Sequence, residues 1–256
     1  MAHITKDKGD LAVVKAIAHL LEHDIRVCMP LSEHLPFDFI AVMPDMTTLR
    51  RVQVKYRAPE RDGILEIRFR GTYYDSKRIY AKPVNLDHID CYAAYCPEND
   101  TLYYLRVDEI PQGSKLVTLR FKPTKNNQRK GIWDASLFTD PRRIAGCETP
   151  VPVQPRAADR ARTFATAKVI EDLMQRGQYV CVPYLSDDLP FDVVAVASGL
   201  VQMRRIRVDT EQAAPSVYVD TYALYDRHTN TTEYCDASQF ALRSQDAFKT
   251  DTVIVG

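Results

Sequence analysis

The sequence lacks a long apolar run and an excess of either charge. No apolar stretch in the 256 residues approaches the roughly 18–20 residues that a membrane-spanning helix needs. Lysine plus arginine and aspartate plus glutamate both number 34, so the formal net charge is zero. A strongly basic field over the whole protein is therefore excluded, and any contact with nucleic acid has to come from local patches.

Cysteine is also scarce. The six cysteines do not form a disulfide framework in a chain of this length, and Cys28 and Cys181 lie in strand-like runs, where buried thiols are common. Cys91 and Cys96 do not have the spacing of a zinc knuckle. The first ten residues, MAHITKDKGD, have no apolar core of the kind found in a secretory signal. We therefore expect a cytoplasmic protein with reduced thiols and no membrane association.

The composition that is present is that of a globular protein, with 45% hydrophobic and 27% charged residues. The length suits one large domain or two small ones. Residues 1–150 hold 23 basic and 20 acidic side chains, whereas residues 151–256 hold 11 and 14. The two halves therefore differ in sign of charge although the whole chain is neutral.

An internal repeat divides the chain. Residues 24–38 (DIRVCMPLSEHLPFD) resemble residues 177–192 (GQYVCVPYLSDDLPFD), at an offset of 153 that becomes 154 after the extra residue Tyr184. Farther on, DCYAAY at 90–95 resembles DTYALY at 220–225, so the second copy is 24 residues shorter in between. The pattern predicts a duplicated domain. The predicted boundaries are residues 1–145 and 156–256, joined by the Pro-rich linker 146–155.

Each copy has the pattern of an α/β domain. Apolar residues from Val13 to Leu21 recur at helical spacing, and Asp24, or Gly177 in the second copy, ends that helix. The segments that follow are short and apolar or alternate in polarity, which is typical of strands. In the first copy these strands are predicted at residues 25–29, 37–43, 51–57, 65–70, 89–95, 102–106 and 115–121. We expect a mixed central sheet flanked by helices in each of two tandem domains.

Polar side chains converge if the strands on either side of Asp45-Met46 form a hairpin. Antiparallel pairing then places Asp38 opposite Gln53, and Lys55 lies two residues farther along on the same face. Asp10, which opens the preceding helix, can face the same place. Carboxylate and amide oxygens are the ligands that Mg²⁺ prefers. An amine beside them can orient or deprotonate an attacking water, or stabilise charge that develops on phosphorus.

Each of these residues also has a simpler interpretation. Asp10 alone is explained as an N-cap or first-turn carboxylate. Alternation alone explains Gln53, Lys55 and Arg57 as the solvated face of an edge strand. Asp38 is harder to explain in this way, because an acid among apolar neighbours is an unusual choice for a strand.

The ordered set of Lys8-Gly-Asp10, Leu35-Pro-Phe-Asp38 and Val52-Gln-Val-Lys55 resembles the PD-(D/E)XK nuclease superfamily. More narrowly, it is similar to the homing endonucleases encoded by group I introns, in which QXK replaces (D/E)XK. The resemblance continues through residues 90–98 and 127–133 and so covers most of the first copy. It implies an αβββαβ core and hydrolysis of phosphodiester bonds in double-stranded DNA with Mg²⁺ or Mn²⁺, leaving a 5′-phosphate and a 3′-hydroxyl.

The resemblance also implies roles for individual residues. Asp38, Gln53, Lys55 and Asp10 would form the catalytic site, with Asp38, Asp10 and Gln53 as the metal ligands. Two departures are visible: Asp10 stands where glutamate is common, and Phe37 separates the proline from Asp38. Neither change removes the ligand chemistry.

The second copy has lost most of this set. Asp192 keeps the acid, but Arg207 replaces the glutamine and Asp209 replaces the lysine. A guanidinium cannot bind a cation, and a carboxylate cannot act as the amine does. We therefore expect a degenerate, non-catalytic copy. The alternative, a metal site rebuilt from Asp192 and Asp209, is disfavoured by the arginine between them.

Basic residues that could contact DNA gather in the first copy. One group lies in and beside the stretch that the second copy lacks, and the other is a basic loop whose amides can reach base edges. For any single one of them solvated surface is the better explanation, but they are lost together with the motif. The first group is Arg57, Arg61, Arg68, Arg70, Lys77, Arg78 and Lys82, and the second is Lys125, Asn127, Gln128, Arg129 and Lys130.

The repeat favours a homodimer in which two intact copies face the duplex and two degenerate copies brace them. Two other functions stay open. A structure-selective nuclease of the Holliday-junction resolvase kind shares the same core, and a DNA-binding protein without cleavage would keep only the binding surface. Metal-dependent nicking separates the last from the other two, and a preference for branched DNA separates the resolvase from a site-specific endonuclease.

Overall fold

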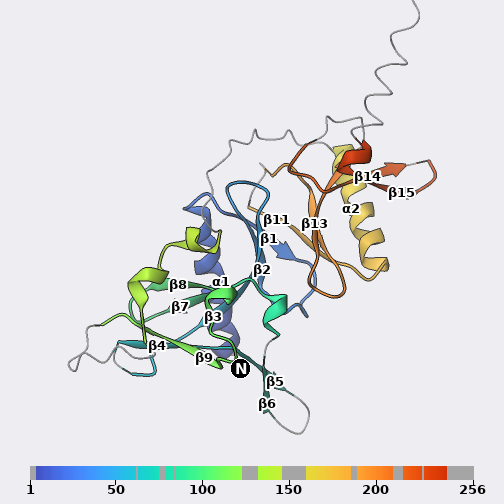
Figure 1. Cartoon of the computed structure of the whole chain (residues 1–256). Coiled ribbons are helices and arrows are strands. Elements are labelled where there is room, and N and C mark those ends of the chain that lie inside the picture. Colours follow the sequence, from blue (N-terminus) through green and yellow to red (C-terminus); the bar gives the residue numbers. More distant parts are fainter. Residues whose placement is uncertain are drawn as a thin grey trace, which may run out of the picture. The chain divides into compact units, whose positions relative to one another are not determined.

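The computed structural model describes residues 4–61, 63–74, 79–83, 85–122, 132–145, 160–185, 189–209, 216–226 and 228–240 (Figure 1). The chain divides into two compact units. The first consists of Met1–Val27, His34–Pro44 and Thr48–Thr149, and the second of Cys28–Glu33, Asp45–Thr47 and Pro150–Gly256. The second unit thus takes in two short segments from the first half of the sequence.

Up to residue 145 the described residues form one long helix, strands that belong to three sheets, and several short 3₁₀ helices. The order is α1 (Ile4–Leu21), β1 (Arg26–Pro30), β2 (Phe39–Val42), β3 (Leu49–Tyr56), β4 (Ile64–Arg68), β5 (Arg70–Tyr74), β6 (Ile79–Pro83), η1 (Leu86–His88), β7 (Cys91–Cys96), β8 (Thr101–Arg106), η2 (Val107–Glu109), β9 (Leu116–Arg120), β10 (Trp133–Asp134), η3 (Ala135–Phe138) and η4 (Pro141–Ile144).

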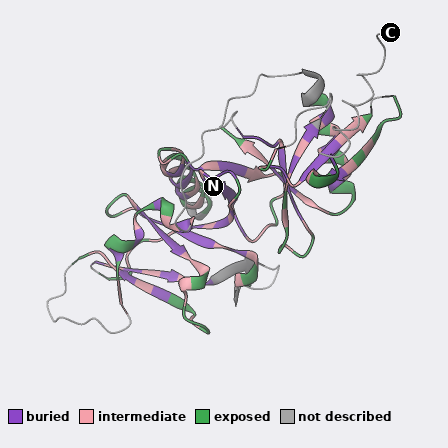
Figure 2. Cartoon of the chain, turned by 45° about the horizontal axis from the view of Figure 1, so that its top comes forward, coloured by how far each residue is buried: buried purple, intermediate pink, exposed green. Residues whose placement is uncertain are grey.

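The core of the first unit is a mixed sheet with the order β2-β3-β7-β8. β3 and β7 are parallel, and the outer two strands are antiparallel to their neighbours. β7 is buried along its whole length, which explains why its sequence does not alternate in polarity (Figure 2). Helix α1 packs on β3 and β7. An apolar cluster joins Tyr92 and Ala94 of β7 to Leu65 and Leu119 of the small sheet β4-β9-β10.

Helix α1 is longer than its apolar periodicity predicted. It spans Ile4–Leu21, so Asp10 lies in its interior and the interpretation of Asp10 as an N-cap is wrong. The helix ends as expected, because Asp24 adopts a left-handed backbone conformation with φ of 60°. The amide of Ile25 donates to the carbonyl of Leu20 at 3.1 Å, which closes the helix in the manner of a Schellman motif.

The second unit repeats this arrangement with fewer elements. They are α2 (Arg160–Gln175), β11 (Tyr179–Tyr184), β12 (Val193–Val196), β13 (Met203–Asp209), β14 (Thr221–Asp226) and β15 (Thr231–Asp236). The sheet has the order β11-β12-β13-β14-β15, in which only β13 and β14 pair in parallel. Val169 and Leu173 of α2 pack against Val193, Ile206 and Ala223 of this sheet. The coarse expectation of a mixed α/β fold is thus confirmed.

Left-handed backbone conformations recur at the offsets of the repeat. They occur after the long helix, at the tip of the hairpin that follows and in the turn between the last two strands of each set. The matched positions and their φ values are Asp24 (60°) and Gly177 (73°), Met46 (58°) and Leu200 (59°), and Asp100 (48°) and Asn230 (54°). Equivalent turns therefore have equivalent backbones, although their residue types differ.

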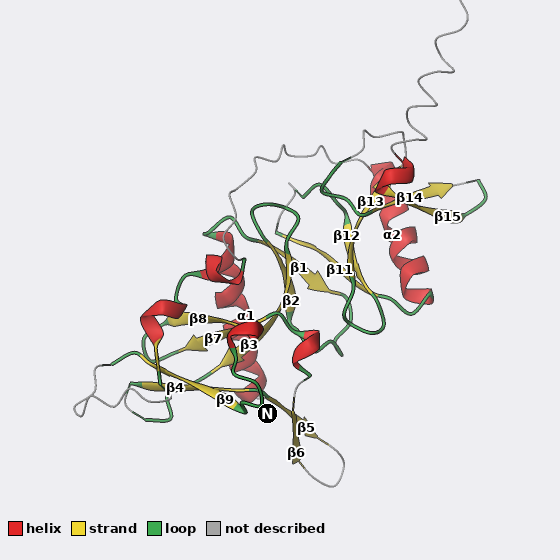
Figure 3. Ribbon diagram, viewed as in Figure 1, coloured by secondary structure: helices red, strands yellow, loops and turns green. Residues whose placement is uncertain are grey.

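One expectation about the core is wrong. Between β3 and β7 the described residues form β4, β5, β6 and the one-turn helix η1, where an αβββαβ core would have a second α-helix (Figure 3). β5 and β6, which the sequence did not predict as strands, pair antiparallel. The 24 residues that the second copy lacks fall within this same part of the chain.

Two expectations from composition can be compared with the described residues. Cys28, Cys91, Cys96, Cys181 and Cys235 are all buried free thiols, as expected for reduced cysteines. Among the helices that the structure describes, none is both long and apolar enough to cross a membrane. The cytoplasmic location stays a prediction.

A buried ion pair joins β3 to the start of β7. Asp90 accepts hydrogen bonds from the backbone amide of Arg51 at 2.7 Å and from its Nε and Nη2 at 3.0 and 2.8 Å. The Arg51 side chain is only 8% exposed. Arg205 and Asp220 repeat the same three bonds in the second unit, at 2.7, 2.9 and 2.6 Å. The pair fixes the parallel strands on which the hairpin is built.

Replacing Asp90 with alanine should lower the free energy of unfolding by about 3 kcal/mol, because it removes the carboxylate that accepts three hydrogen bonds from the buried Arg51. Urea unfolding monitored by circular dichroism measures the change. Asp108→Ala removes an exposed partner of Arg106, and its effect should stay within about 0.5 kcal/mol. Equal losses in the two variants would show that the Arg51–Asp90 pair does not stabilise the sheet.

Candidate active site

The candidate site lies at the open end of the β2–β3 hairpin. Phe39 pairs with Val52 and Val42 pairs with Leu49, which confirms the register that the sequence predicted. In this register Asp38 falls opposite Gln53. The acid therefore stands at the point where the two strands stop pairing.

Where the backbone hydrogen bonds between β2 and β3 end, the Asp38 carboxylate accepts the next hydrogen bond from β3. Its own amide donates to the carbonyl of Val52 at 2.8 Å, and the amide of Val54 donates to Asp38 Oδ2 at 2.6 Å. Gln53 Nε2 donates to the same oxygen at 2.5 Å. Among the described residues, Asp38 Oδ1 and Gln53 Oε1 have no hydrogen-bond partner, so two oxygens at this position are left for a ligand.

Burial shifts the pKa values of the acid and the amine in opposite directions. Burial raises the pKa of Asp38, and the charge of Asp10 adds to this, against the opposing effects of the Val54 hydrogen bond, Lys55 and Gln53. Burial likewise lowers the pKa of Lys55, helped by the charge of Arg57 and opposed by Asp38. Both groups are therefore driven towards their neutral forms, as is common at functional sites.

The predicted metal ligands fit a hard cation. Asp10 is exposed on α1, and its carboxylate is near enough to Asp38 to raise the pKa of that acid. Asp38, Gln53 and Asp10 together offer carboxylate and amide oxygens, the donors that Mg²⁺ prefers. The raised pKa of Asp38 shows that Lys55 alone does not compensate the buried negative charge. A divalent cation would supply the missing positive charge.

Three of the predicted DNA contacts have described side chains. Arg57 directly follows β3, and Arg61 is exposed. Arg68 forms ion pairs with Glu60 at 2.9 Å and with Glu66 at 2.8 Å, so its charge is largely compensated within the protein. The case for a phosphate contact is therefore weaker for Arg68 than for the exposed Arg61.

The remaining predicted DNA contacts lie outside the part of the chain whose side chains are described. Arg70 and Lys82 are placed by backbone only, in β5 and β6. The others lie outside the described residues altogether: Lys77, Arg78, Lys125, Asn127, Gln128, Arg129 and Lys130.

The second unit keeps the backbone of this site and changes its chemistry. The Asp192 amide donates to the carbonyl of Ile206 at 2.9 Å, and the Val208 amide donates to Asp192 Oδ2 at 2.7 Å. Arg207 falls opposite Asp192, where the first unit has its glutamine. Its Nε is buried without a hydrogen-bond partner among the described residues. Asp209 is placed by backbone only, at the end of β13.

Motif analysis missed two features that position the site. The Arg51–Asp90 pair holds β3 against β7, two positions before the residue pair Gln53 and Tyr92. The repeat contained a signal for it, because both partners occur at matched places in the second copy. Lys8 lies over the Tyr56 ring, 5.6 Å from its centroid, and so brings a second amine to this end of β3.

A mixed sheet that presents a buried acid, an amide and an amine at the end of one hairpin defines a class of hydrolytic sites. A family model described as PD-(D/E)XK endonuclease matches residues 3–141. The chain belongs to the PD-(D/E)XK endonuclease family. Among solved structures it is similar to that of a bacterial homing endonuclease, I-Ssp6803I, with 28% sequence identity and a TM-score of 0.41 over 49% of this chain and 83% of that one. No curated protein matches the chain at a significant level.

Replacing Asp38 with asparagine should stabilise the metal-free protein at neutral pH by about 1 kcal/mol, because it removes a buried charge that folding disfavours. The pKa of Asp38 is raised in the folded state, so the folded wild type binds a proton more readily than the unfolded chain. The stability of the wild type therefore increases as the pH falls through that pKa. The advantage of the variant should therefore shrink in acid. Urea unfolding in the presence of a chelator, at neutral pH and in mild acid, measures both effects.

Asp192→Asn is the matched control. Asp192 accepts the same backbone hydrogen bond, but a cationic side chain stands opposite it. The variant should therefore gain no stability at neutral pH. If Asp38→Asn were destabilising at every pH, the Asp38 carboxylate would be a purely structural cap.

Proposed function

We propose that the protein is a divalent-metal-dependent, site-specific endonuclease that hydrolyses phosphodiester bonds of double-stranded DNA. The observation that carries this proposal is the contact of Asp38 with Gln53 at the end of the hairpin, with the amine of Lys55 on the same face of β3. Membership of the PD-(D/E)XK endonuclease family supports the reaction class. The QXK form of the motif supports the narrower, homing-endonuclease-like function.

Lys55 is suited to act on the attacking water. Because its pKa is lowered, a larger share of the amine is neutral at physiological pH than for an exposed lysine. A neutral amine can accept a proton from water as the oxygen attacks phosphorus, and the resulting ammonium can stabilise the charge that develops there. The nearby Asp38 carboxylate favours that ammonium once it has formed.

Asp38, Asp10 and Gln53 would hold Mg²⁺ or Mn²⁺. The bound ion would supply positive charge to the scissile phosphate and lower the pKa of water. The chain's own part is to hold the acid in place. The Val54 amide and Gln53 Nε2 both anchor Oδ2 of Asp38, so its other oxygen keeps a fixed direction.

We infer further that the two units arose by duplication and that the second is non-catalytic. The matched left-handed turns, the repeated Arg–Asp pair and the repeated amide-to-carboxylate bond support the duplication. Arg207 and Asp209 in place of the glutamine and the lysine support the loss of activity. DNA would then be cut by the first unit alone.

The activity test is nicking of supercoiled plasmid in the presence of Mg²⁺. Lys55→Ala should reduce the rate by about 10²–10⁴-fold, because it removes the proton acceptor. Affinity for duplex DNA, measured in Ca²⁺ by a mobility shift, should stay nearly unchanged. Loss of binding together with cleavage would make Lys55 a phosphate contact rather than a catalytic residue.

The equivalent variant in the second unit, Asp209→Ala, should cut DNA at the wild-type rate. A large loss there would overturn the assignment of the second unit as non-catalytic. Absence of nicking by the wild type on any substrate would leave a DNA-binding protein. Faster cleavage of a four-way junction than of linear duplex would favour a structure-selective nuclease.

The proposed arrangement on DNA is a homodimer with two active first units. Light scattering should give a mass near twice the 29.2 kDa of the chain. A mass of one chain at every concentration tested would remove the dimer from the proposal without affecting the chemistry of the site.

A further inference from the structure

Three potential metal ligands converge at the C-terminal end of α1. His19, Glu22 and His23 each offer a ligand atom, and these atoms all lie within 4.8 Å of one another. Residues at i, i+3 and i+4 share one face of a helix, which is the spacing that brings two histidines to one metal. Neither the predicted catalytic set nor the predicted DNA contacts include any of the three.

The two imidazoles are oriented by hydrogen bonds through their Nδ1 atoms. His23 Nδ1 lies 2.8 Å from the carbonyl oxygen of His19, which can only accept, so Nδ1 carries the proton and Nε2 of the neutral ring has a free lone pair. His19 Nδ1 contacts the hydroxyl of the buried Tyr104 at 2.9 Å. Histidines that bind metals are commonly held in this way, with the second ring nitrogen bonded to a carbonyl or another polar group.

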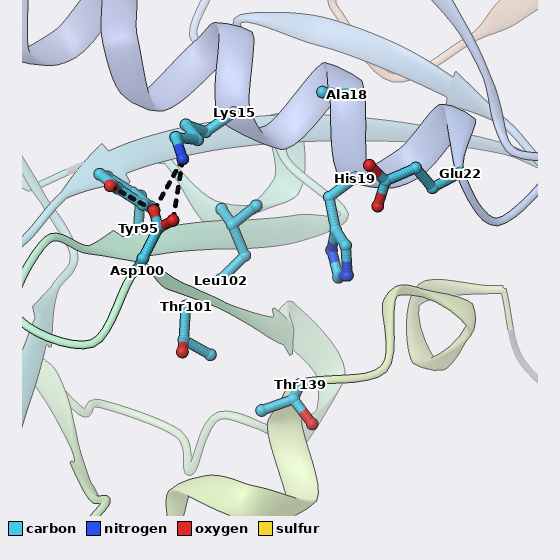
Figure 4. A pocket seen from close by; sticks show the side chains of 9 residues that line it. All are labelled: Lys15, Ala18, His19, Glu22, Tyr95, Asp100, Thr101, Leu102 and Thr139. Atoms are coloured by element: carbon cyan, nitrogen blue, oxygen red, sulfur yellow. Dashed lines mark hydrogen bonds and ion pairs between the residues drawn. The ribbon is translucent and has the colours of Figure 1, made fainter.

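The cluster borders an open space. His19 and Glu22 line a cavity of about 330 Å³ together with Thr139, and the Glu22 carboxylate lies beside the His19 side chain (Figure 4). The Asp140 carboxylate is close enough to interact electrostatically with both imidazoles. A cation held by the three side chains would therefore have room for water as a further ligand and a second negative charge nearby.

In the second unit a positively charged side chain occupies the equivalent position. At the offsets of the repeat, Asp172 and Arg176 replace the two histidines, and Tyr234 replaces Tyr104. Tyr234 donates to Asp172 Oδ2 at 2.7 Å, and Arg176 Nε lies 2.8 Å from the same oxygen. The helix end in the second unit thus carries its own cation.

The first unit has ligands at this place and no such cation. Lys15, one turn earlier on α1, is bonded to Asp100 at 2.8 and 3.0 Å. Among the described residues, no lysine or arginine pairs with Glu22. The position therefore combines three electron-pair donors, one of which is a carboxylate that no described lysine or arginine pairs with.

We propose that His19, Glu22 and His23 bind a divalent transition metal of the Zn²⁺ kind. Two imidazole nitrogens and one carboxylate are a ligand set typical of zinc, whereas Mg²⁺ prefers oxygen donors alone. The site is separate from the proposed nuclease centre in its residues and in its metal preference. Bound metal would hold the three side chains at the end of α1 together and stabilise the first unit, because the unfolded chain does not keep the ligands in this arrangement.

Isothermal titration of the metal-free full-length protein with Zn²⁺, in millimolar Mg²⁺, tests the proposal. The wild type should bind one zinc ion with an affinity that His23→Ala and Glu22→Gln each weaken. Loss of a group that only orients a ligand costs about 10–100-fold, so loss of a ligand should cost at least about 100-fold. Zn²⁺ should also raise the unfolding temperature of the wild type and leave that of His23→Ala unchanged.

His34→Ala is the control, because His34 is exposed and is not among the three proposed ligands. It should bind zinc as the wild type does. Glu22→Gln guards against a folding defect, since Glu22 is exposed and its replacement is nearly isosteric. Equal affinity of wild type, His23→Ala and Glu22→Gln for Zn²⁺, or no binding by a folded wild type, would overturn the proposal. Neither result would affect the nicking assay.

Discussion

The geometry of the candidate site depends on the hydrogen bond from the Val54 amide to the Asp38 carboxylate. β3 is held on its other side by parallel pairing with β7 and by the Arg51–Asp90 pair, so the Val54 amide has a fixed position and direction. The hydrogen bond from this amide therefore also fixes the position of the Asp38 carboxylate. A side chain that ends a ladder in place of a backbone carbonyl lets the strands part without leaving a buried amide unpaired.

The half-buried place of this carboxylate creates an electrostatic conflict that the hydrogen bond offsets only in part. Once Asp38 is fixed at the amide, it is partly buried and near Asp10, and its pKa rises. Lys55 is buried beside it, and the pKa of the amine falls because removal from water outweighs the attraction of one carboxylate. Neither charge fully compensates the other. Such an arrangement costs folding stability, and opposed pKa shifts of this kind are common at functional sites.

The sequence was sufficient to predict the hairpin and its register. The position of the hairpin turn and the alternation of β3 determine which side chains stand opposite one another. Asp38 and Gln53 lie where this pairing places them. The start of α1 was not predicted, because Lys6-Asp-Lys-Gly-Asp10 carries no apolar periodicity. β5 and β6 were not predicted as strands, because the basic residues of this stretch were interpreted only as DNA contacts. The ligands on α1 have an ordinary amphipathic spacing, and only their side-chain orientation distinguishes them from a solvated helix face.

The second unit separates what a carboxylate does for the fold from what it does for chemistry. Asp192 caps its hairpin with the same backbone bond as Asp38, although the glutamine and the lysine are gone. In both units the acid accepts the hydrogen bond of the backbone amide at the end of the ladder, so its presence alone says nothing about catalysis. The chemical assignment has to rest on Gln53 and Lys55, the residues that the fold of the second unit does without. A tyrosine that contacts the long helix is likewise kept in both units. Tyr104 contacts His19 in the first unit, and Tyr234 contacts Asp172 in the second, where Asp172 forms an ion pair with Arg176.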